Sequence, residues 1–534
     1  MTLDGFLTAL TLLVGLFALV PAVQRLRATL AAPVQGTLAM VAVLAILWLE
    51  LREPALTCPS WLGGMCAWLE LDGDKASIAR KDAFLVVLAW ALAAFAIHRF
   101  SRVRAGSVPA LARLAARLID EGRMGEALAL LEPHVELFVS VSRRRGRWQR
   151  LHDQVQSFGQ PDPWNFDDPP RRAMGLNWPG WASAMVRRFS ALIPAQAEAE
   201  AAAIDTFRLV HHSPQLLAYM ADQRPYLALP FLSAETYSRG EFSDAFLERL
   251  IASPGSALYQ ELEQNQNLEH PIGYALPERN RLLHFLFSDS RFAVRLGVWQ
   301  PVGNYLERLL DGAETPGYID RLNGSAKWYE REWWRDPAYV GFFFFDVMVT
   351  SALRQGVANH MWLFYFPHFA ERIARVYDSS GPDIDRHAEF PTRAARLLYE
   401  LVSYMTGWIK ALPDLPDGSP HRTLPANRNQ TGTNIPFSAA TALGRTLAAI
   451  LRSPRVDEEV TQTLHDVVMR MIQELPREGD LARLRQWVIE EVVHGGGGRI
   501  PQDYNAHLTV LFTNTDHVVR ADIEDYAAAL NAAA

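Results

Sequence analysis

Cysteine is nearly absent from this chain, which holds only Cys58 and Cys66 among its 534 residues. Two cysteines are too few for a disulfide scaffold or for a zinc site built from thiolates. A basic surplus is missing as well, because the formal net charge is -7 and the sequence pI is about 6.1. Proteins that coat nucleic acid usually show the opposite balance. We therefore expect neither a disulfide-rich scaffold nor a nucleic-acid-binding protein.

The familiar catalytic motifs are also lacking. The sequence contains no GxSxG nucleophile elbow, no HExxH zinc helix, no dinucleotide-binding GxGxxG and no protein-kinase motif set. Four consecutive glycines at 495–498 lack the Lys-Ser/Thr pair of a phosphate-binding loop, and we interpret them as a hinge or flexible loop. No cofactor is predicted, and no motif indicates an enzyme.

Long apolar runs are present near the N-terminus. They cover Gly5–Val23, Pro33–Leu49 and Ala83–Ile97. A helix that spans a membrane needs roughly 20 mostly apolar residues, so these runs predict about three transmembrane helices, the third being short. The alternatives are a cleaved signal peptide for the first run and a buried hairpin of a soluble protein for all three. A signal peptide is disfavoured because the chain begins MTLDG, without a basic residue.

The flanks of these runs predict the topology. Arginines follow the first and third runs, and such residues favour the cytoplasmic side: Arg25, Arg27, Arg99, Arg102 and Arg104. The N-terminus and the loop 51–82 would then lie outside. That loop holds Cys58 and Cys66, for which we predict a disulfide, the alternative being two unpaired thiols. We expect a multi-pass protein of the inner (plasma) membrane with a cytoplasmic C-terminal domain.

Residues beyond the anchor show apolar residues at helical spacing and few alternating runs, which predicts an all-α region. We divide the chain by composition into an anchor, a hairpin with a basic helix, a Pro/Trp-rich connector, a helical domain, a loop and a C-terminal helical subdomain. These parts cover 1–104, 105–158, 159–182, 183–411, 412–436 and 437–534.

The stretch Ala110–Pro133 reads as two amphipathic helices joined at Gly122–Gly125, with the small residues Ala115 and Ala127 where the helices would cross. It resembles a single tetratricopeptide hairpin, in which small residues let the two helices pack closely and Pro133 ends the second. An ordinary helical hairpin is the alternative, since no second copy follows at the period of 34 residues.

A basic cluster follows this hairpin. It consists of Arg143, Arg144, Arg145, Arg147 and Arg150. Arginines close to a membrane anchor favour contact with anionic lipid headgroups or another anion. The alternative is a solvated helix face.

One short stretch carries candidate metal ligands. Asp383, Asp385, His387 and Glu389 alternate along the sequence, so an extended backbone would place them on one side. Carboxylate oxygens and imidazole nitrogen are ligands for a divalent metal. The alternative is a solvated loop before the next helix.

The stretch Tyr339–Leu353 is strongly apolar but interrupted by Asp346. It is too short to span a membrane comfortably, so we predict a core helix. A buried carboxyl group needs a partner, and His360 and His368 are the candidates that the sequence offers.

These patterns favour a membrane-anchored α-helical interaction or scaffold protein that recruits or senses a protein partner. The alternative is an oligomeric channel or membrane-disrupting effector, assembled from several copies and gated by the soluble domain. A second alternative is an unrecognised metal-dependent enzyme that uses the stretch Asp383–Glu389.

Overall fold

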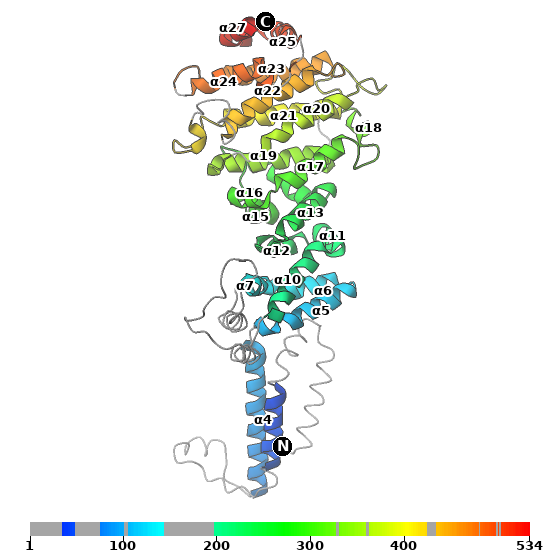
Figure 1. The fold of residues 1–534 in the computed structure, drawn as a ribbon, viewed down its shortest axis with the longest axis vertical. Helices are drawn as coiled ribbons and strands as arrows, with labels where there is room; N and C mark the ends of the chain where they lie inside the picture. Colours follow the sequence, from blue (N-terminus) through cyan, green and yellow to red (C-terminus); the bar gives the residue numbers. More distant parts are fainter. Residues whose placement is uncertain are drawn as a thin grey trace, which may run out of the picture. The chain divides into compact units, whose positions relative to one another are not determined.

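The computed structural model describes residues 35–48, 75–100, 105–143, 197–326, 331–358, 362–423, 434–479, 481–497, 500 and 503–533. Within these ranges the chain forms α-helices and short 3-10 turns, and no strand (Figure 1). Two isolated β-bridges join Glu269 to Tyr274 and Ser325 to Thr392. The predicted all-α class is confirmed.

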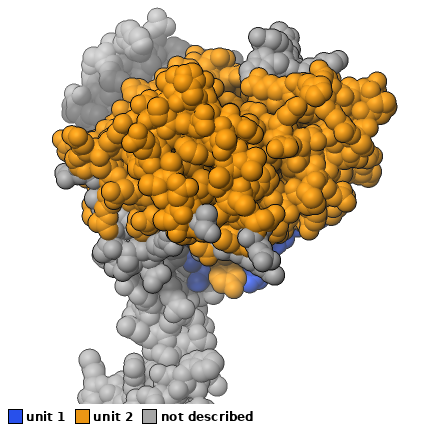
Figure 2. Space-filling view, turned by 90° about the horizontal axis from the view of Figure 1, so that it is seen from above, with its two compact units in different colours: residues 1–216, 234–236 blue, residues 217–233, 237–534 orange. Residues whose placement is uncertain are grey.

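The chain divides into two compact units, coloured separately in Figure 2. Unit 1 comprises residues 1–216 and 234–236, and unit 2 comprises residues 217–233 and 237–534.

Unit 1 contains two apolar helices, one at 35–48 and the other, α4, at Lys75–Phe100. They pack through Ala42 and Ile46 of the first against Val86, Val87 and Trp90 of the second. Among the described residues, no helix is both long and apolar enough to cross a membrane. The first predicted transmembrane segment, Gly5–Val23, lies outside the described ranges.

Unit 1 also contains the predicted hairpin, as α5 (Val108–Asp120) and α6 (Met124–Leu131). Ala115 and Ala127 are both fully buried where these helices meet, as the sequence predicted. Between the helices Gly122 has a φ of 76°, a left-handed conformation that favours glycine. Two further helices, α7 (Val135–Arg143) and α10 (Ala197–His212), pack on each other, and α10 also packs on α5.

Unit 2 holds most of the other described helices. Its longer ones are α13 (Arg239–Ala252), α14 (Ala257–Asn265), α17 (Trp299–Leu310), α19 (Pro337–Gln355), α20 (Tyr365–Val376), α21 (Arg393–Lys410), α22 (Ile435–Leu451), α23 (Glu458–Glu474), α24 (Ala482–Val493), α25 (Tyr504–Asn514) and α27 (Glu524–Ala533). From α17 onward, many of them pack on the helix two places along the chain, as α17 does on α19, α19 on α21 and α22 on α24 (Figure 1).

Helix α19 forms the centre of the core, and its sequence explains both ends. Asp336 accepts hydrogen bonds from the first backbone N–H groups of the helix, and Pro337 fits the first turn because it has no N–H to satisfy. Gly356 ends the helix in a left-handed conformation, with a φ of 64°. Nearly all its side chains are buried, so the predicted core helix is confirmed.

Glycines bring α22 and α24 unusually close together. A Cβ atom on Gly444 of α22 would lie 2.2 Å from the carbonyl oxygen of Glu491 and 2.7 Å from the backbone nitrogen of Gly496. Gly495 and Gly496 form a 3-10 turn packed on α22, both with positive φ and both buried. These glycines therefore make a tight contact, and the interpretation of this part of the run as a hinge is wrong.

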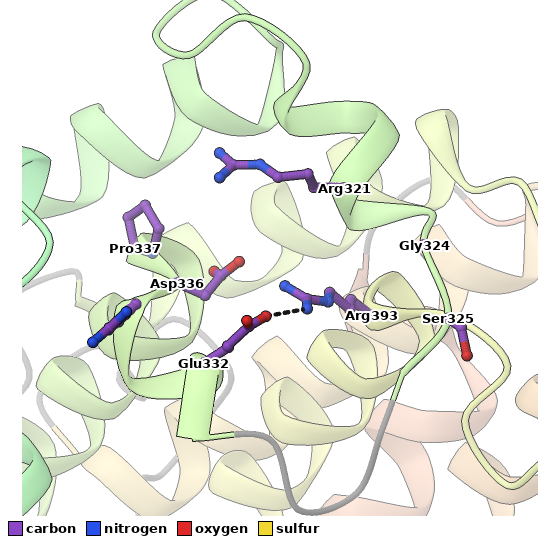
Figure 3. A pocket seen from close by; sticks show the side chains of 8 residues that line it. Arg321, Gly324, Ser325, Glu332, Asp336, Pro337 and Arg393 are labelled. Carbon is purple, nitrogen blue, oxygen red and sulfur yellow. Dashed lines mark hydrogen bonds and ion pairs between the residues drawn. The ribbon is translucent and has the colours of Figure 1, made fainter.

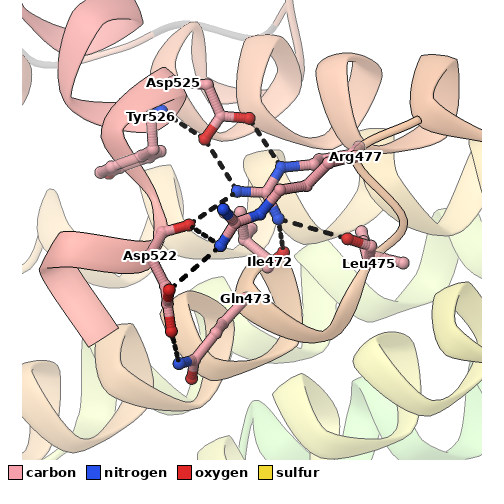
Figure 4. A network of polar contacts seen from close by, with 8 residues as sticks. Ile472, Gln473, Leu475, Arg477, Asp522, Asp525 and Tyr526 are labelled. Atoms are coloured by element: carbon pink, nitrogen blue, oxygen red, sulfur yellow. Dashed lines mark hydrogen bonds and ion pairs between the residues drawn. The ribbon is translucent and has the colours of Figure 1, made fainter. Parts of the chain in front are cut away.

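A buried arginine joins the C-terminal helices. The guanidinium of Arg485 on α24 contacts both carboxylate oxygens of Asp525 and the carbonyl oxygens of Ile472, Leu475 and Asp522 (Figure 4). The Arg485 side chain is 2% exposed, so its charge is compensated within the protein. One side chain thus fixes the ends of four helices, α23, α24, α26 (His517–Asp522) and α27.

Candidate functional site

Unit 2 contains a charged pocket of about 450 Å³. Its lining includes three arginines and two acids: Arg321, Arg335, Arg393, Glu332 and Asp336. Gly324, Ser325 and Pro337 complete it (Figure 3). We refer to it below as the arginine pocket.

Two short elements and the first turns of two long helices bring these residues together. Arg321 lies in α18 (Tyr318–Leu322), and Glu332 and Arg335 lie in the 3-10 turn η7 (Arg331–Arg335). Pro337 and Arg393 are the first residues of α19 and α21. The Arg393 N–H donates to the carbonyl oxygen of Gly324 at 3.0 Å, which ties the segment after α18 to the start of α21.

The Asp336 carboxyl group is fixed at the base of α19. Its Oδ1 accepts hydrogen bonds from the Tyr318 hydroxyl at 3.0 Å and from the backbone N–H groups of Ala338 and Tyr339 at 2.9 and 3.1 Å. Burial raises the pKa of Asp336 above its ordinary value, against the lowering effect of these hydrogen bonds and of Arg393. Asp336 therefore has a structural task as the helix cap.

The arginines differ in their pairing. Arg393 donates to the Glu332 carboxylate at 3.0 Å, and its guanidinium also lies over the Trp333 ring. Arg321 lies over the Tyr318 ring at 5.5 Å. Neither Arg321 nor Arg335 forms an ion pair with another described residue. Two of the three cations therefore lack a carboxylate partner among the residues that the structure describes.

The pocket can hold an anion. Arginine guanidinium groups present several N–H donors in a fixed plane that matches carboxylate and phosphate oxygens. Figure 3 shows Glu332 and Arg393 joined across the pocket, with Arg321 extending over Asp336 and Pro337. Both long helices that begin here, α19 and α21, direct their positive dipole ends toward it.

The predicted metal ligands do not converge in the structure. Asp383, Asp385, His387 and Glu389 are all exposed. Asp385 accepts a hydrogen bond from the His387 backbone N–H, and the His387 ring contacts Glu459 at 3.0 Å. Within the described ranges, no three His, Cys, Asp or Glu side chains lie close enough together to hold a metal ion. This stretch is an exposed turn, in which Asp385 bonds to the backbone two residues on and the His387 ring turns to Glu459.

Other predicted sites fall outside the described residues. Cys58 and Cys66, with their predicted disulfide, are among them, and so are Arg144, Arg145, Arg147 and Arg150. Arg143 is the last residue of α7.

Asp346 is buried as expected, but its partners differ from those that the sequence suggested. Its carboxylate accepts hydrogen bonds from Trp408 Nε1 at 2.7 Å and from the Tyr274 hydroxyl at 2.8 Å. His368, one of the two histidines proposed, lies instead against Phe364, and the other, His360, is outside the described ranges. The two donors come from α21 and from a loop 72 residues earlier, so helical spacing could not identify them.

The sequence reasoning missed the arginine pocket altogether. Its three arginines are separated by stretches of 14 and 58 residues (335 − 321 and 393 − 335), and no motif links them. The one local signal was Asp336-Pro337, a typical start of a helix.

Comparison with known proteins adds no further guide to the site, because no family model, no curated protein and no solved structure matches this chain.

Proposed function

We propose that this chain is a membrane-anchored α-helical protein, whose N-terminal apolar helices enter the inner membrane and whose helical body recruits or senses a partner. The proposal includes a body on the cytoplasmic side. It is carried by one observation, the apolar outer surface of the helix at 35–48 and α4.

The helix at 35–48 and the part of α4 from Phe84 to Phe95 are apolar on both of their faces. Their inner faces pack together through Ala42, Ile46 and Trp90. Their outer faces expose large apolar side chains at helical spacing, which are Met40, Val41, Leu44, Leu47 and Trp48 on the first helix and Phe84, Leu88, Leu92 and Phe95 on α4. A helix that is apolar all round belongs in a protein core or in a bilayer.

The described outer stripe on α4 is short for a complete crossing. From Phe84 to Phe95 it covers about 17 Å, against a hydrocarbon thickness of about 30 Å. Neighbouring apolar residues must therefore contribute to the anchor. The apolar run Ala83–Ile97 extends the stripe along the same helix, and Pro33–Leu49 and Gly5–Val23 supply the other segments of the proposed anchor.

A sensing or recruiting role fits a large helical body tethered by a small anchor, since tethering raises the effective concentration of its surface near the bilayer. The chain has 534 residues, of which fewer than a fifth belong to the predicted anchor.

Alkaline carbonate extraction of membranes from expressing cells tests the anchor. The unaltered chain should remain with the membrane pellet. Leu44→Asp with Leu92→Asp, both on the outer faces, should release it, because each central acid costs about 2.5–3.5 kcal/mol on insertion. Val510→Asp is the matched control, since Val510 is a similarly exposed apolar residue on α25. An unaltered chain found wholly in the soluble fraction would refute the anchor.

Orientation and partner need separate experiments. A membrane-impermeant maleimide, applied to intact cells after mild reduction, should label Cys58 and Cys66 if their loop faces outside.

A photo-crosslinker at the fully exposed Tyr237 or at Phe364 should trap a discrete species in cells. That species should be lost when the anchor carries the two aspartates. If the variant with the two aspartates is released from the membrane and still gives the cross-linked species in unchanged yield, recruitment at the membrane is contradicted.

A further inference from the structure

We propose that the arginine pocket binds a small molecule that carries a phosphate group. This inference goes beyond the anchoring function and does not depend on it, because the pocket lies wholly within unit 2.

The cations of the pocket come from three different elements, which gives them different approach directions. Arg321 belongs to α18, Arg335 to η7 and Arg393 to the first turn of α21. A tetrahedral phosphate offers oxygens in several directions and accepts paired hydrogen bonds from planar guanidinium groups. Donors that line one pocket from separate elements therefore suit phosphate better than a single planar carboxylate.

The acids of the pocket do not oppose such a ligand equally. The Asp336 carboxylate is held at the α19 N-terminus by Tyr318 and two backbone N–H groups. These three bonds all go to its Oδ1, and burial raises the pKa of Asp336, which favours the neutral form and weakens its repulsion of an anion.

Glu332 is the group that a ligand would displace. Its side chain is 67% exposed, while that of Arg393 is 19% exposed. An ion pair with so exposed a partner contributes little to stability, so exchanging it for an incoming anion is cheap. The Glu332 carboxylate thus marks one place where an anionic group of the ligand would lie.

The N-termini of two helices and the volume of the arginine pocket also favour a phosphate-bearing ligand. The N-termini of α19 and α21, helices of 19 and 18 residues, both begin at the pocket, where their dipoles favour negative charge. A volume of about 450 Å³ lies within the range of about 300–1,000 Å³ that is typical of small-molecule sites. The ligand is therefore larger than phosphate alone.

Isothermal titration calorimetry of the full-length chain in detergent tests the proposal, with inorganic pyrophosphate as the probe. We expect saturable binding that weakens as sodium chloride is raised. Arg321→Gln and Arg335→Gln should each weaken it about tenfold or more, because each removes a charged donor. Arg291→Gln is the matched control, an exposed arginine on α16 (Ser290–Leu296) that does not line the pocket, and it should bind as the unaltered chain does.

Glu332→Gln gives the decisive result, because it should tighten pyrophosphate binding by several-fold, and a misfolded variant cannot gain affinity. The proposal is overturned if the unaltered chain shows no saturable binding up to about 10 mM, or if the pocket variants bind as the control does. It is also overturned if a poly-glutamate peptide binds in a way that requires Arg321 and Arg335 while pyrophosphate does not. Detergent solution removes the membrane from the assay, so these failures are distinct from failure of the anchor.

Discussion

The indole Nε1 of Trp408 donates a hydrogen bond of 2.7 Å to Oδ1 of Asp346, which joins α21 to the middle of α19, a helix whose side chains are nearly all buried. The Tyr274 hydroxyl binds the other oxygen of the same carboxylate at 2.8 Å. Two neutral donors thus satisfy a carboxyl group inside a run of phenylalanines. Burial outweighs them and raises the pKa of Asp346 from 3.8 to about 6, with Glu400 adding to the increase.

This raised pKa predicts a pH-dependent stability. The folded chain favours the neutral carboxyl group, so the contribution of Asp346 is fully present below about pH 4 and is lost as the pH rises through about 6. The shift corresponds to about 3 kcal/mol in the free energy of unfolding. Asp346→Asn keeps both contacts, since its amide group can accept from Trp408 and donate to Tyr274. We expect the difference in unfolding free energy between variant and parent to change by about 2.5 kcal/mol between pH 4 and pH 7.

Urea unfolding of both proteins at several pH values measures that difference. Burial holds the pKa of Tyr404 well above 10, so Tyr404 stays protonated throughout this range. Glu400 is present in both proteins and enters the difference only through its repulsion of Asp346. A difference that stays constant across this pH range would show that Asp346 does not titrate there.

Glu261 caps a helix from outside. Its buried carboxylate accepts hydrogen bonds from the backbone N–H groups of Leu282 and Leu283, at the start of α15 (Arg281–Phe287), and from the Tyr226 hydroxyl. Glu261→Gln replaces one acceptor oxygen by a donor, so we expect a loss of about 1–3 kcal/mol in the free energy of unfolding. Glu263 is an exposed residue of α14, the helix that also carries Glu261. Glu263→Gln should change the free energy of unfolding by less than about 0.5 kcal/mol. Equal effects of the two substitutions would contradict the capping role.

We expect Arg485 to contribute much more to the free energy of unfolding than its neighbour Arg477. Arg485→Ala leaves three carbonyl groups and Asp525 without their buried donor, and we expect a loss of about 3–5 kcal/mol. Arg477 also contacts Asp522, but its side chain is 56% exposed, so Arg477→Ala should cost less than about 1 kcal/mol. Denaturant unfolding of the two variants compares them, and a loss below about 1 kcal/mol for Arg485→Ala would refute the network as a stabilising element.

Gly444→Ala tests the close approach of α22 and α24. The added methyl group would lie 2.2 Å from a carbonyl oxygen, so the helices must separate, at a cost of about 1–3 kcal/mol. Gly407→Ala on α21 is the matched control, because its Cβ meets nothing within 4 Å. There the substitution should stabilise the chain by about 0.5–1 kcal/mol through helix propensity. Thermal unfolding should move in opposite directions for the two variants, and a shift in the same direction would contradict the packing account.

Local patterns in the sequence determined much of the fold. Apolar spacing indicated an all-α protein, and small residues located the crossing of α5 and α6 at Ala115 and Ala127. The length of the run around Asp346 excluded a comfortable membrane span and predicted a buried helix. These features depend on neighbours within a few residues along the chain, which is why the sequence reveals them. The break between α13 and α14, where Gly255 has a φ of 90°, is one that helical spacing did not indicate.

The tertiary structure alone decided which distant groups meet. Trp408 and Tyr274 reach Asp346 from 62 and 72 residues away, and Arg485 meets Asp525 from 40 residues away. The arginine pocket needs α18, η7 and the starts of α19 and α21 in one place. Conversely, the alternating acids after Asp383 looked like a site only because an extended backbone was assumed, and the turn that forms there separates them. Sites depend on packing between helices, and packing is a property of the whole core rather than of any local pattern.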